Sequence, residues 1–361
     1  MSRIRSSLGT AAVTLAVMLT ASCTDERAES RRTPAPSSPA TAASSPAATA
    51  PTTDAPSTRL SPSPTTTDAT PVDPVSLPAL FDRSYDGGGL RVRDVIARTD
   101  AYTSYSVTYR SGRLRISGKL DVPRGRGPFP ALVLAHGYID PAVYDNGQGM
   151  RREQDWLARA GYVVLHTDYR NHAFSSKDPA ADRRLRLGYG VDVVNAVKTL
   201  RRTDLARVDD DRVGLVGRSL GGGVVYNVLV AQPGLVDAAV VFAPVSSLAA
   251  ENFDRWVRDD PGRSMLSDRI LADHGSPEGN PRFWREASPR TYFDRVTEPV
   301  LIHHGTADES CPIRWSRASL RALRAAGATA AMFTYQGEPH AFVADWPLSM
   351  RRTTAFLRRN L

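Results

Sequence analysis

The sequence predicts an α/β fold in which a mostly parallel sheet is covered by helices on both faces. From residue 131 onward, short and nearly continuous apolar runs alternate with amphipathic segments of helix length. Strands of a parallel sheet are buried on both faces, so they appear as continuous apolar runs rather than alternating ones. Two alternating segments joined by a turn precede this region. The predicted folded part has roughly 280 residues, which suits one domain of this class.

The chain begins with a segment, residues 1–22, that has the form of a signal peptide. Basic residues precede an apolar stretch over residues 8–19, which is too short to span a bilayer and leads into small residues. The ending before Cys23 resembles the bacterial lipoprotein signal, although that signal usually has an aliphatic residue where this chain has Thr20. The resemblance implies lipidation at Cys23 and an extracellular protein anchored to the outer face of the bacterial cell membrane. Simple secretion with a free Cys23 thiol is the alternative.

Residues 23–79 are dominated by Ala, Pro, Ser and Thr and show no sustained apolar period. Such a segment cannot bury enough apolar surface to offset the entropy lost on ordering, so it is predicted to be disordered. It would act as a tether between Cys23 and a catalytic domain that spans residues 80–361.

An antiparallel hairpin is predicted near the start of this domain. Residues 105–109 and 114–120 alternate, and the turn signal Ser111-Gly112 lies between them, so they are expected to form antiparallel edge strands. The later apolar runs predict strands at residues 131–135, 162–166, 213–216, 238–242, 299–303 and 331–335. The intervening segments predict helices at residues 150–160, 191–200, 313–325 and 342–357.

A Gly-framed serine follows the strand predicted at residues 213–216. In Gly217-Arg218-Ser219-Leu220-Gly221, the glycines allow a sharp strand-to-helix turn that exposes the serine hydroxyl at its tip. The apolar segment after it, residues 222–230, is long enough for a buried helix. The pattern therefore predicts a nucleophile elbow with Ser219 as the nucleophile, and the arrangement of strands and helices around it is that of an α/β-hydrolase. A plain structural turn is the alternative.

Two further side chains are expected to activate Ser219. A serine hydroxyl is a poor nucleophile near neutral pH, so it needs a base that takes its proton and a third group that holds the base. Asp308 follows the strand at residues 299–303 and His340 follows the next strand, in the chain order Ser, acid, His. We assign His340 as the general base and acid, and Asp308 as the residue that orients it.

Alternatives stay open for these residues. Asp308 could cap the following helix, and His340 could be a residue of a surface loop. Glu338 is a rival acid, but its place two residues before His340 suits a carboxylate arriving from a neighbouring strand poorly. His303 and His304 lie at a strand end and are expected to pack or support rather than to act as bases.

The oxyanion hole is expected from two backbone N–H groups, each worth about 3 kcal/mol in the transition state. One belongs to Leu220, which follows the nucleophile. The other belongs to Tyr138, in the loop after the strand at residues 131–135. The side chain of His136 in the same loop is expected to be structural.

The composition argues against nucleic-acid, metal and dinucleotide sites. The formal net charge is +8, but the arginines that supply most of the positive charge are scattered along the chain. The seven histidines are dispersed, and neither a His-Glu-x-x-His nor a Cys-x-x-Cys pattern occurs. The glycines around Ser219 lack the spacing of a dinucleotide fingerprint. We therefore expect no cofactor, no metal and no nucleic-acid partner.

Several motifs in order along residues 103–361 carry a family resemblance. They are Tyr109-Arg110-Ser111-Gly112, Ile116-Ser117-Gly118, His136-Gly137, Asp168-Tyr169-Arg170, Gly217-Arg218-Ser219-Leu220-Gly221-Gly222, Ser288-Pro289 leading to Pro299, His304-Gly305-Thr306-Ala307-Asp308 and Gly337-Glu338-Pro339-His340. On these motifs the chain resembles the catalytic domain of the prolyl oligopeptidase family of serine peptidases, which are close relatives of dienelactone hydrolases and acetyl esterases. The resemblance implies the same triad that the residues themselves indicate.

The chain departs from this family pattern in two places. Many family members have an N-terminal β-propeller, but about 25 residues separate the predicted tether from the hairpin, fewer than the roughly 40 of one propeller blade. No propeller is therefore expected. Residues 171–176, which follow Asp168-Tyr169-Arg170, also lack the glycines usual there.

Residues 246–290 are a candidate for a small helical cap over the site. Phe253, Trp256 and Trp284 would then line an acyl or leaving-group pocket. The alternative is a set of surface helices whose aromatic side chains turn into the core. Cys311 is expected to be a buried structural thiol.

Together these observations predict a serine hydrolase that cleaves a small peptide or ester through an acyl-enzyme. A carboxylesterase similar to acetyl esterases, with little amide activity, is the alternative among enzymes, because no propeller is expected. A catalytically inactive binding lipoprotein is the alternative of another class.

Overall fold

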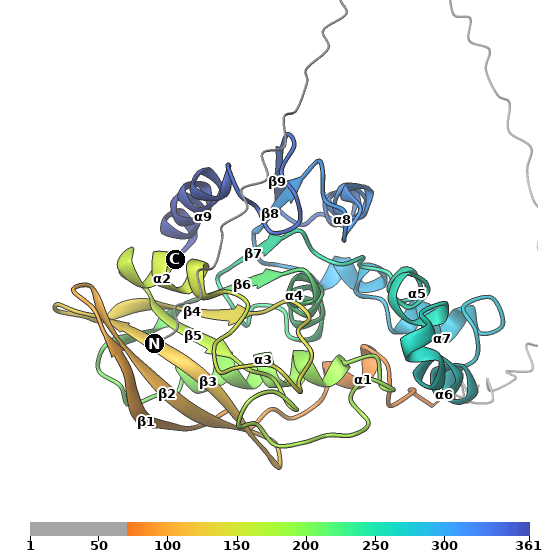
Figure 1. Ribbon diagram of the computed structural model, residues 1–361, viewed down its shortest axis with the longest axis horizontal. Helices are drawn as coiled ribbons and strands as arrows, with labels where there is room; N and C mark the ends of the chain where they lie inside the picture. Colours follow the sequence, from red (N-terminus) through yellow and green to blue (C-terminus); the bar gives the residue numbers. More distant parts are fainter. Residues whose placement is uncertain (1–70) are drawn as a thin grey trace, which may run out of the picture. The chain divides into compact units, whose positions relative to one another are not determined.

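A computed structural model describes residues 71–361, which form one nine-stranded sheet with helices on both faces (Figure 1). The predicted signal peptide at residues 1–22, Cys23 and most of the predicted tether lie outside the described residues. None of the helices between residues 71 and 361 has both the length and the apolar character needed to cross a membrane.

The sheet is mostly parallel, as predicted. Its strands are β1 (Gly88–Arg98), β2 (Tyr102–Ser111), β3 (Leu114–Pro123), β4 (Phe129–Ala135), β5 (Val163–Thr167), β6 (Val208–Arg218), β7 (Ala238–Phe242), β8 (Val300–Gly305) and β9 (Ala330–Tyr335). They lie side by side in the order β1-β2-β3-β5-β4-β6-β7-β8-β9. The pairs from β1 to β5 are antiparallel, and all pairs from β5 to β9 are parallel. The α/β-hydrolase fold class is confirmed.

The predicted hairpin exists, but it is not at the edge of the sheet. β2 and β3 pair from Tyr102↔Pro123 to Ser111↔Leu114 around a turn that contains Gly112. The edge is formed by β1, which the sequence analysis missed. Most residues of β1 are exposed, and the strand contains several arginines and an aspartate. Its apolar residues do not keep a regular alternation, and its register with β2 shifts at several places, so the strand becomes visible only in the fold.

The main helices form two layers against the sheet. They are α2 (Arg151–Arg159), α3 (Leu187–Leu200), α4 (Leu220–Ala231), α8 (Ile313–Ala325) and α9 (Trp346–Asn360). Apolar residues of α2 and α9 share one core with one face of the sheet, and those of α3, α4 and α8 share the core on the other face (Figure 1). α4 is apolar on nearly every side because it lies between the sheet and other helices, so almost all of it is buried.

Two predicted boundaries differ from the structure. The catalytic domain begins before residue 80, because Leu77 is fully buried and its N–H donates to the Glu286 carbonyl (3.0 Å) just before α1 (Pro78–Phe81). Val75 and Leu77 stand between prolines and form too short a run to give a periodic signal in the sequence. The last helix begins at Trp346 rather than 342, because the preceding loop is held open by the Glu338 carboxylate, which accepts the N–H of Asp345 (2.9 Å).

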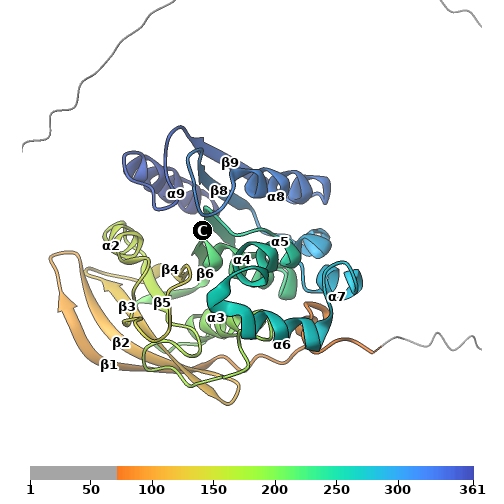
Figure 2. The ribbon, with the colours of Figure 1, turned by 45° about the vertical axis from the view of Figure 1, so that its right-hand side comes forward.

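Residues 246–290 form a group of short helices beside α4. These are α5 (Ala249–Phe253), α6 (Ser264–His274) and α7 (Pro281–Glu286), with a π-helical turn at Asp254–Arg258 and a 3₁₀ turn at Pro261–Arg263. Figures 1 and 2 both show α5, α6 and α7 gathered together. They share a small apolar core of their own, built on aromatic side chains of α5 and α7. We call this group the cap.

The turn from β6 to α4 depends on two glycines. Ser219 at its tip has φ 55° and ψ −120°, a strained conformation for a residue with a side chain. A Cβ on Gly217 would lie 2.4 Å from the Gly221 carbonyl oxygen, and a Cβ on Gly221 would lie 1.9 Å from the Ala135 carbonyl oxygen. Glycine is therefore the residue that lets α4 start this close to the end of β4.

Several histidines are buried in or beside the sheet without charge. Burial lowers the pKa of His136 and of His303 to about 3, and it lowers the pKa of His166 well below the ordinary value. The ring nitrogens of His303 contact the Tyr335 hydroxyl (2.7 Å) and the Thr353 hydroxyl (3.0 Å). Because these rings are neutral in the fold, protonation favours the unfolded chain.

This burial predicts a steep loss of stability in mild acid. In the unfolded chain a histidine titrates near pH 6.5, so His136 and His303 each lower the free energy of unfolding as the pH falls from about 6.5 to about 3, by roughly 1.4 kcal/mol per pH unit. Denaturant unfolding of the full chain at several pH values measures this slope. His303→Gln is expected to reduce the slope of the free energy of unfolding against pH by roughly 1.4 kcal/mol per pH unit, the contribution of one proton. Thr353→Val should lower the free energy of unfolding at every pH and leave this slope unchanged. An unchanged slope in His303→Gln would contradict the assignment.

Candidate active site

Ser219 lies at the end of β6, where the strand passes into α4. Its N–H donates to the Phe242 carbonyl of β7 (2.9 Å), and its carbonyl accepts the N–H of Val245 (3.1 Å) and of residues in the first turn of α4. These bonds hold the strained backbone of the turn in place. Ser219 lines a cavity that also contains His340.

Asp308 and His340 are brought together from the loops after β8 and β9. Nδ1 of His340 lies 2.8 Å from Oδ2 of Asp308, whose side chain is fully buried. The His340 side chain is 19% exposed, so its ring reaches the cavity surface. With Nδ1 held by Asp308, Nε2 is left for the hydroxyl of Ser219. Asp308 and His340 therefore form the acid–histidine pair that an activated serine needs, and Ser219 lines the same cavity as His340.

The Asp308 carboxylate is fully engaged. Oδ1 accepts the N–H groups of Ser310 (2.9 Å) and Cys311 (2.7 Å), and Oδ2 contacts both His340 and His304. Burial raises the pKa of this carboxyl, but hydrogen bonds from the two histidines and the backbone outweigh it, so the pKa lies below its ordinary value. Asp308 is thus a carboxylate at neutral pH, and it does not cap the helix that follows, whose N-cap position is held by Pro312 without a side-chain cap.

His304 is a second imidazole on the acid, a role that the sequence analysis described only as support. Its Nε2 lies 3.1 Å from Oδ2 of Asp308 and 2.9 Å from the Cys311 carbonyl. Its Nδ1 lies 2.6 Å from the Ser316 hydroxyl. Because both partners of Nε2 are acceptors, Nε2 carries a proton and donates, and the Ser316 hydroxyl is the partner of Nδ1. His304 therefore helps to fix the orientation of the Asp308 carboxylate through its contact with Oδ2.

The loop that carries His340 is anchored by charged side chains that the sequence analysis did not single out. The Arg218 guanidinium forms a buried ion pair with Glu153 of α2 and donates to the Ala341 carbonyl (3.2 Å). The Trp346 indole N–H donates to the same Glu153 carboxylate (2.8 Å). The rival acid Glu338 is occupied by backbone N–H groups in this loop. No local motif marks Arg218 and Glu153, because they lie far apart along the chain.

Two unpaired backbone donors lie next to Ser219. Leu220 is the first residue of α4, so its N–H has no partner within the helix. A Cβ on Gly137 would lie 3.2 Å from Cβ of Ser219, which places the loop after β4 directly against the nucleophile. Among residues 71–361, the N–H groups of Leu220 and Tyr138 have no hydrogen-bond acceptor. Both are available to an oxyanion.

The loop after β4 is held by Asp168, which follows β5. Its carboxylate accepts hydrogen bonds from the Ser117 hydroxyl (2.7 Å), the Tyr144 hydroxyl (2.9 Å) and the Gly147 N–H (2.9 Å). The buried ring of His136 stacks on Tyr144 and is structural.

The residues after Asp168 adopt strained backbone conformations. Tyr169, Asn171 and Ala173 have positive φ values of 56°, 73° and 42°. These non-glycine residues thus take left-handed conformations in the segment where the sequence lacks the family's usual glycines. The departure in sequence changes the residues of this loop but not its need for left-handed backbone.

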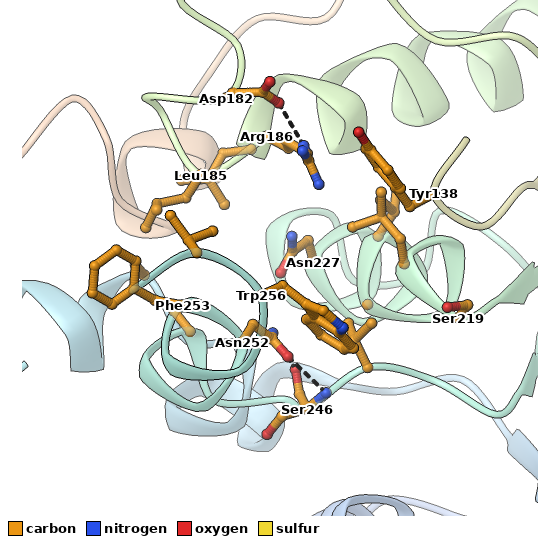
Figure 3. Close-up of a pocket in the computed structure, with 18 of the residues that line it drawn as sticks. Tyr138, Asp182, Leu185, Arg186, Ser219, Asn227, Ser246, Asn252, Phe253 and Trp256 are labelled. Carbon is orange, nitrogen blue, oxygen red and sulfur yellow. Dashed lines mark hydrogen bonds and ion pairs between the residues drawn. The ribbon is translucent and has the colours of Figure 1, made fainter. Parts of the chain in front are cut away.

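The cavity beside Ser219 has a volume of about 350 Å³ and lies between α4, the cap and the loop after β4 (Figure 3). Its lining is mainly apolar and comes from α4, from the segment before α3 and from the cap. It includes Leu185, Val224, Phe253, Val257, Leu266 and Ile270. The cavity can therefore hold an apolar group attached to the reacting carbonyl.

The three aromatic residues predicted for this pocket behave differently. Phe253 and Trp256 line the cavity. The prediction for Trp284 is wrong, because this residue is buried inside the cap, where its ring packs on Phe253 (centroids 4.9 Å) and its indole N–H donates to the Gly275 carbonyl (3.1 Å). The Trp284 ring packs in the core of the cap. Whether an aromatic residue of the cap faces this core or the cavity depends on how each helix is turned, which the sequence does not show.

Cys311 is a buried free thiol close to the nucleophile. Burial raises the pKa of its thiol to about 12, while a hydrogen bond with Ser219 acts in the opposite direction. The thiol therefore stays protonated and does not compete with Ser219 as a nucleophile.

Comparison with known proteins agrees with this geometry. Dipeptidyl aminopeptidase BIII of Pseudoxanthomonas mexicana is 24% identical over 243 residues, covering 66% of this chain and 33% of that protein. Esterase EstD of Thermotoga maritima is 30% identical over 214 residues, covering 54% of this chain and 50% of that protein. The chain thus spans one third to one half of the length of these relatives.

A solved structure and a family model complete the comparison. The acetyl xylan esterase from Paenibacillus sp. R4 shares the fold with a TM-score of 0.61 at 17% identity, over 79% of this chain and 92% of that chain. The model of the prolyl oligopeptidase family matches residues 148–361. This match covers more than half of the 361 residues, and the chain therefore belongs to the prolyl oligopeptidase family, a family of serine hydrolases.

Proposed function

We propose that this chain hydrolyses ester or peptide bonds through an acyl-enzyme formed on Ser219. One observation carries the proposal: Ser219, on a strained turn, shares a cavity with His340, whose Nδ1 is held by the buried carboxylate of Asp308. The peptidase and esterase among the relatives support both kinds of bond.

The proposed reaction has two halves, acylation and deacylation, and His340 accepts and then donates a proton in each. Nε2 of His340 takes the proton of Ser219 Oγ as this oxygen bonds to the carbonyl carbon of the substrate. Asp308 stabilises the imidazolium through its bond to Nδ1–H, and the N–H groups of Leu220 and Tyr138 stabilise the oxyanion. The leaving group departs with the proton from His340. A water molecule then gives a proton to His340 as its oxygen attacks the acyl carbon. His340 passes this proton to Ser219 Oγ as the bond between that oxygen and the acyl group breaks.

The nucleophile can be tested with a fluorophosphonate probe, which labels activated serines. Labelling of the wild-type chain is expected, and Ser219→Ala should abolish it and reduce ester turnover at least roughly a thousandfold, because no other group can form the acyl-enzyme. Ser264→Ala is a matched control, since this exposed serine at the start of α6 does not line the cavity. Absence of labelling in the wild type would favour a catalytically inactive binding protein.

The kind of bond can be tested by comparing a 4-nitrophenyl acyl ester with aminoacyl and X-Pro 4-nitroanilides. The proposal expects turnover of the ester and of at least one anilide, both lost in Ser219→Ala. Turnover of the ester alone would favour the alternative, a carboxylesterase with little peptidase activity. That alternative is favoured by the single sheet of residues 71–361, which holds no propeller within the described part of the chain.

We also propose that the enzyme is extracellular and tethered to the membrane through a lipidated Cys23. The support is the sequence of residues 1–79 alone, with its short apolar stretch before Cys23 and its Ala/Pro/Ser/Thr-rich tract. An acyl chain contributes about 0.8 kcal/mol of membrane affinity per buried CH₂ group. Cys23→Ser, or treatment with globomycin, is expected to move the protein from the membrane fraction to the soluble one. Unchanged membrane retention after both would contradict lipidation.

A further inference from the structure

Two arginines line the otherwise apolar cavity beside Ser219. Nε of Arg186 donates to Oδ1 of Asp182 (2.6 Å). Within residues 71–361 no hydrogen bond involves either terminal nitrogen of the Arg186 guanidinium. Figure 3 shows this guanidinium directed into the cavity, with Asp182 on the side away from Ser219. The Arg186 side chain is only 17% exposed, so its two free nitrogens lack the hydration of a surface arginine.

Arg263 of the cap lines the same cavity and contacts the same aromatic ring as Arg186. Its guanidinium lies 4.9 Å from the ring centroid of Tyr138, and that of Arg186 lies 4.7 Å from the same centroid. The only ion pair of Arg263 among the described residues is a 3.5 Å contact with Asp260, which is 44% exposed. Such a pair is weak in water. Two cations thus share one aromatic ring, and an anion bound near both guanidinium groups reduces their mutual repulsion.

The backbone that presents Arg186 is strained. Leu185 and Arg186 have consecutive positive φ values of 50° and 56°, and both side chains line the cavity. Left-handed conformations in non-glycine residues persist only where the surrounding structure requires them, and they concentrate at functional sites. With this strained backbone, one apolar and one cationic side chain both face the cavity.

The charged groups of the cavity lining are mainly cationic. Besides His340, its ionisable charges are Arg186, Arg263 and Asp182, and Asp182 is already paired with Arg186. Asn227 of α4 adds an amide that makes no side-chain hydrogen bond within residues 71–361. The other polar residues of the lining are neutral and include Ser246, Asn252 and Ser310, of which the Asn252 amide is bonded to the Ser246 backbone, and the rest of the wall is apolar. A ligand that fits this cavity has an apolar body and an oxygen-rich anionic end.

We propose that Arg186 and Arg263 are specificity-determining residues that select a substrate carrying a carboxylate. This inference rests on the proposed function and names the substrate class of the same site. A planar carboxylate matches the fork of a guanidinium and can accept from its two free nitrogens. An ammonium group at this position would be repelled by both arginines. The carboxylate belongs to the acyl part or to the leaving group.

Two matched pairs of esters test the selection on the full chain. The acyl arm compares 4-nitrophenyl hydrogen adipate with its methyl ester, and the leaving-group arm compares 4-carboxyphenyl hexanoate with its methyl ester. In at least one arm, kcat/KM is expected to be about tenfold higher for the carboxylate. That preference should disappear in Arg186→Gln and Arg263→Gln and be retained in part by Arg186→Lys. No preference in either arm, or a preference unchanged in both glutamine variants, overturns the proposal.

The control is Arg184→Gln, because Arg184 is exposed in the same segment and does not line the cavity. This variant should keep the wild-type preference and turn over the neutral esters at the wild-type rate. Arg263 lies in another part of the chain from Arg186, so the Arg263 variant decides the test if Arg186→Gln does not fold.

A binding measurement separates this proposal from the proposed reaction. Hexanoate and hexanamide are titrated calorimetrically into the Ser219→Ala chain, which binds without turnover. Hexanoate is expected to bind about tenfold more tightly than hexanamide, and Arg186→Gln in the same background should remove the difference. Equal binding of the two compounds overturns the anion site even if the esters are hydrolysed. Loss of all ester turnover in the wild type, with selective hexanoate binding intact, would instead count against the proposed reaction.

Discussion

The close approach of α4 to the end of β4 is the constraint on which the whole site depends. Gly221 lies so near the Ala135 carbonyl that no side chain fits between them, and Ser219 accepts a strained backbone in return for this contact. The same approach brings Gly137 and the loop after β4 against the nucleophile. Nucleophile and oxyanion donors are thus positioned by one packing contact between a helix and a strand, before any catalytic side chain is considered.

Asp308 connects this turn to the other half of the sheet. One of its oxygens is satisfied by backbone N–H groups of its own loop, and the other by the imidazoles of His304 and His340. A carboxylate can be buried here because every lone pair has a donor. His304, held in turn by Ser316, links Asp308 to α8, so this carboxylate is positioned by the framework as well as by His340.

The division between chemistry and selectivity follows the layers of the fold. The reacting groups lie on loops at the carboxyl edge of the parallel strands, as in other doubly wound sheets. The cavity walls come from α4, from the cap and from the segment before α3. Changes in the cap can therefore alter which acyl or leaving group is accepted without moving Ser219 or Asp308. Arg263 and Arg186 are examples, because neither contacts the triad through any hydrogen bond among the described residues.

The sequence by itself determined the parallel part of the sheet, the turn at Ser219 and the positions of Asp308 and His340. These features rest on local signals: apolar runs of strand length, glycines that a strained turn requires, and polar residues just past a strand end. Only the tertiary structure decided the rest. The exposed edge strand β1, the second imidazole of His304 on Asp308, the Arg218–Glu153 pair and the inward direction of Trp284 depend on contacts between distant segments. The contact of both Arg186 and Arg263 with the ring of Tyr138 is of the same kind, because no spacing along the chain relates the cap to the start of α3.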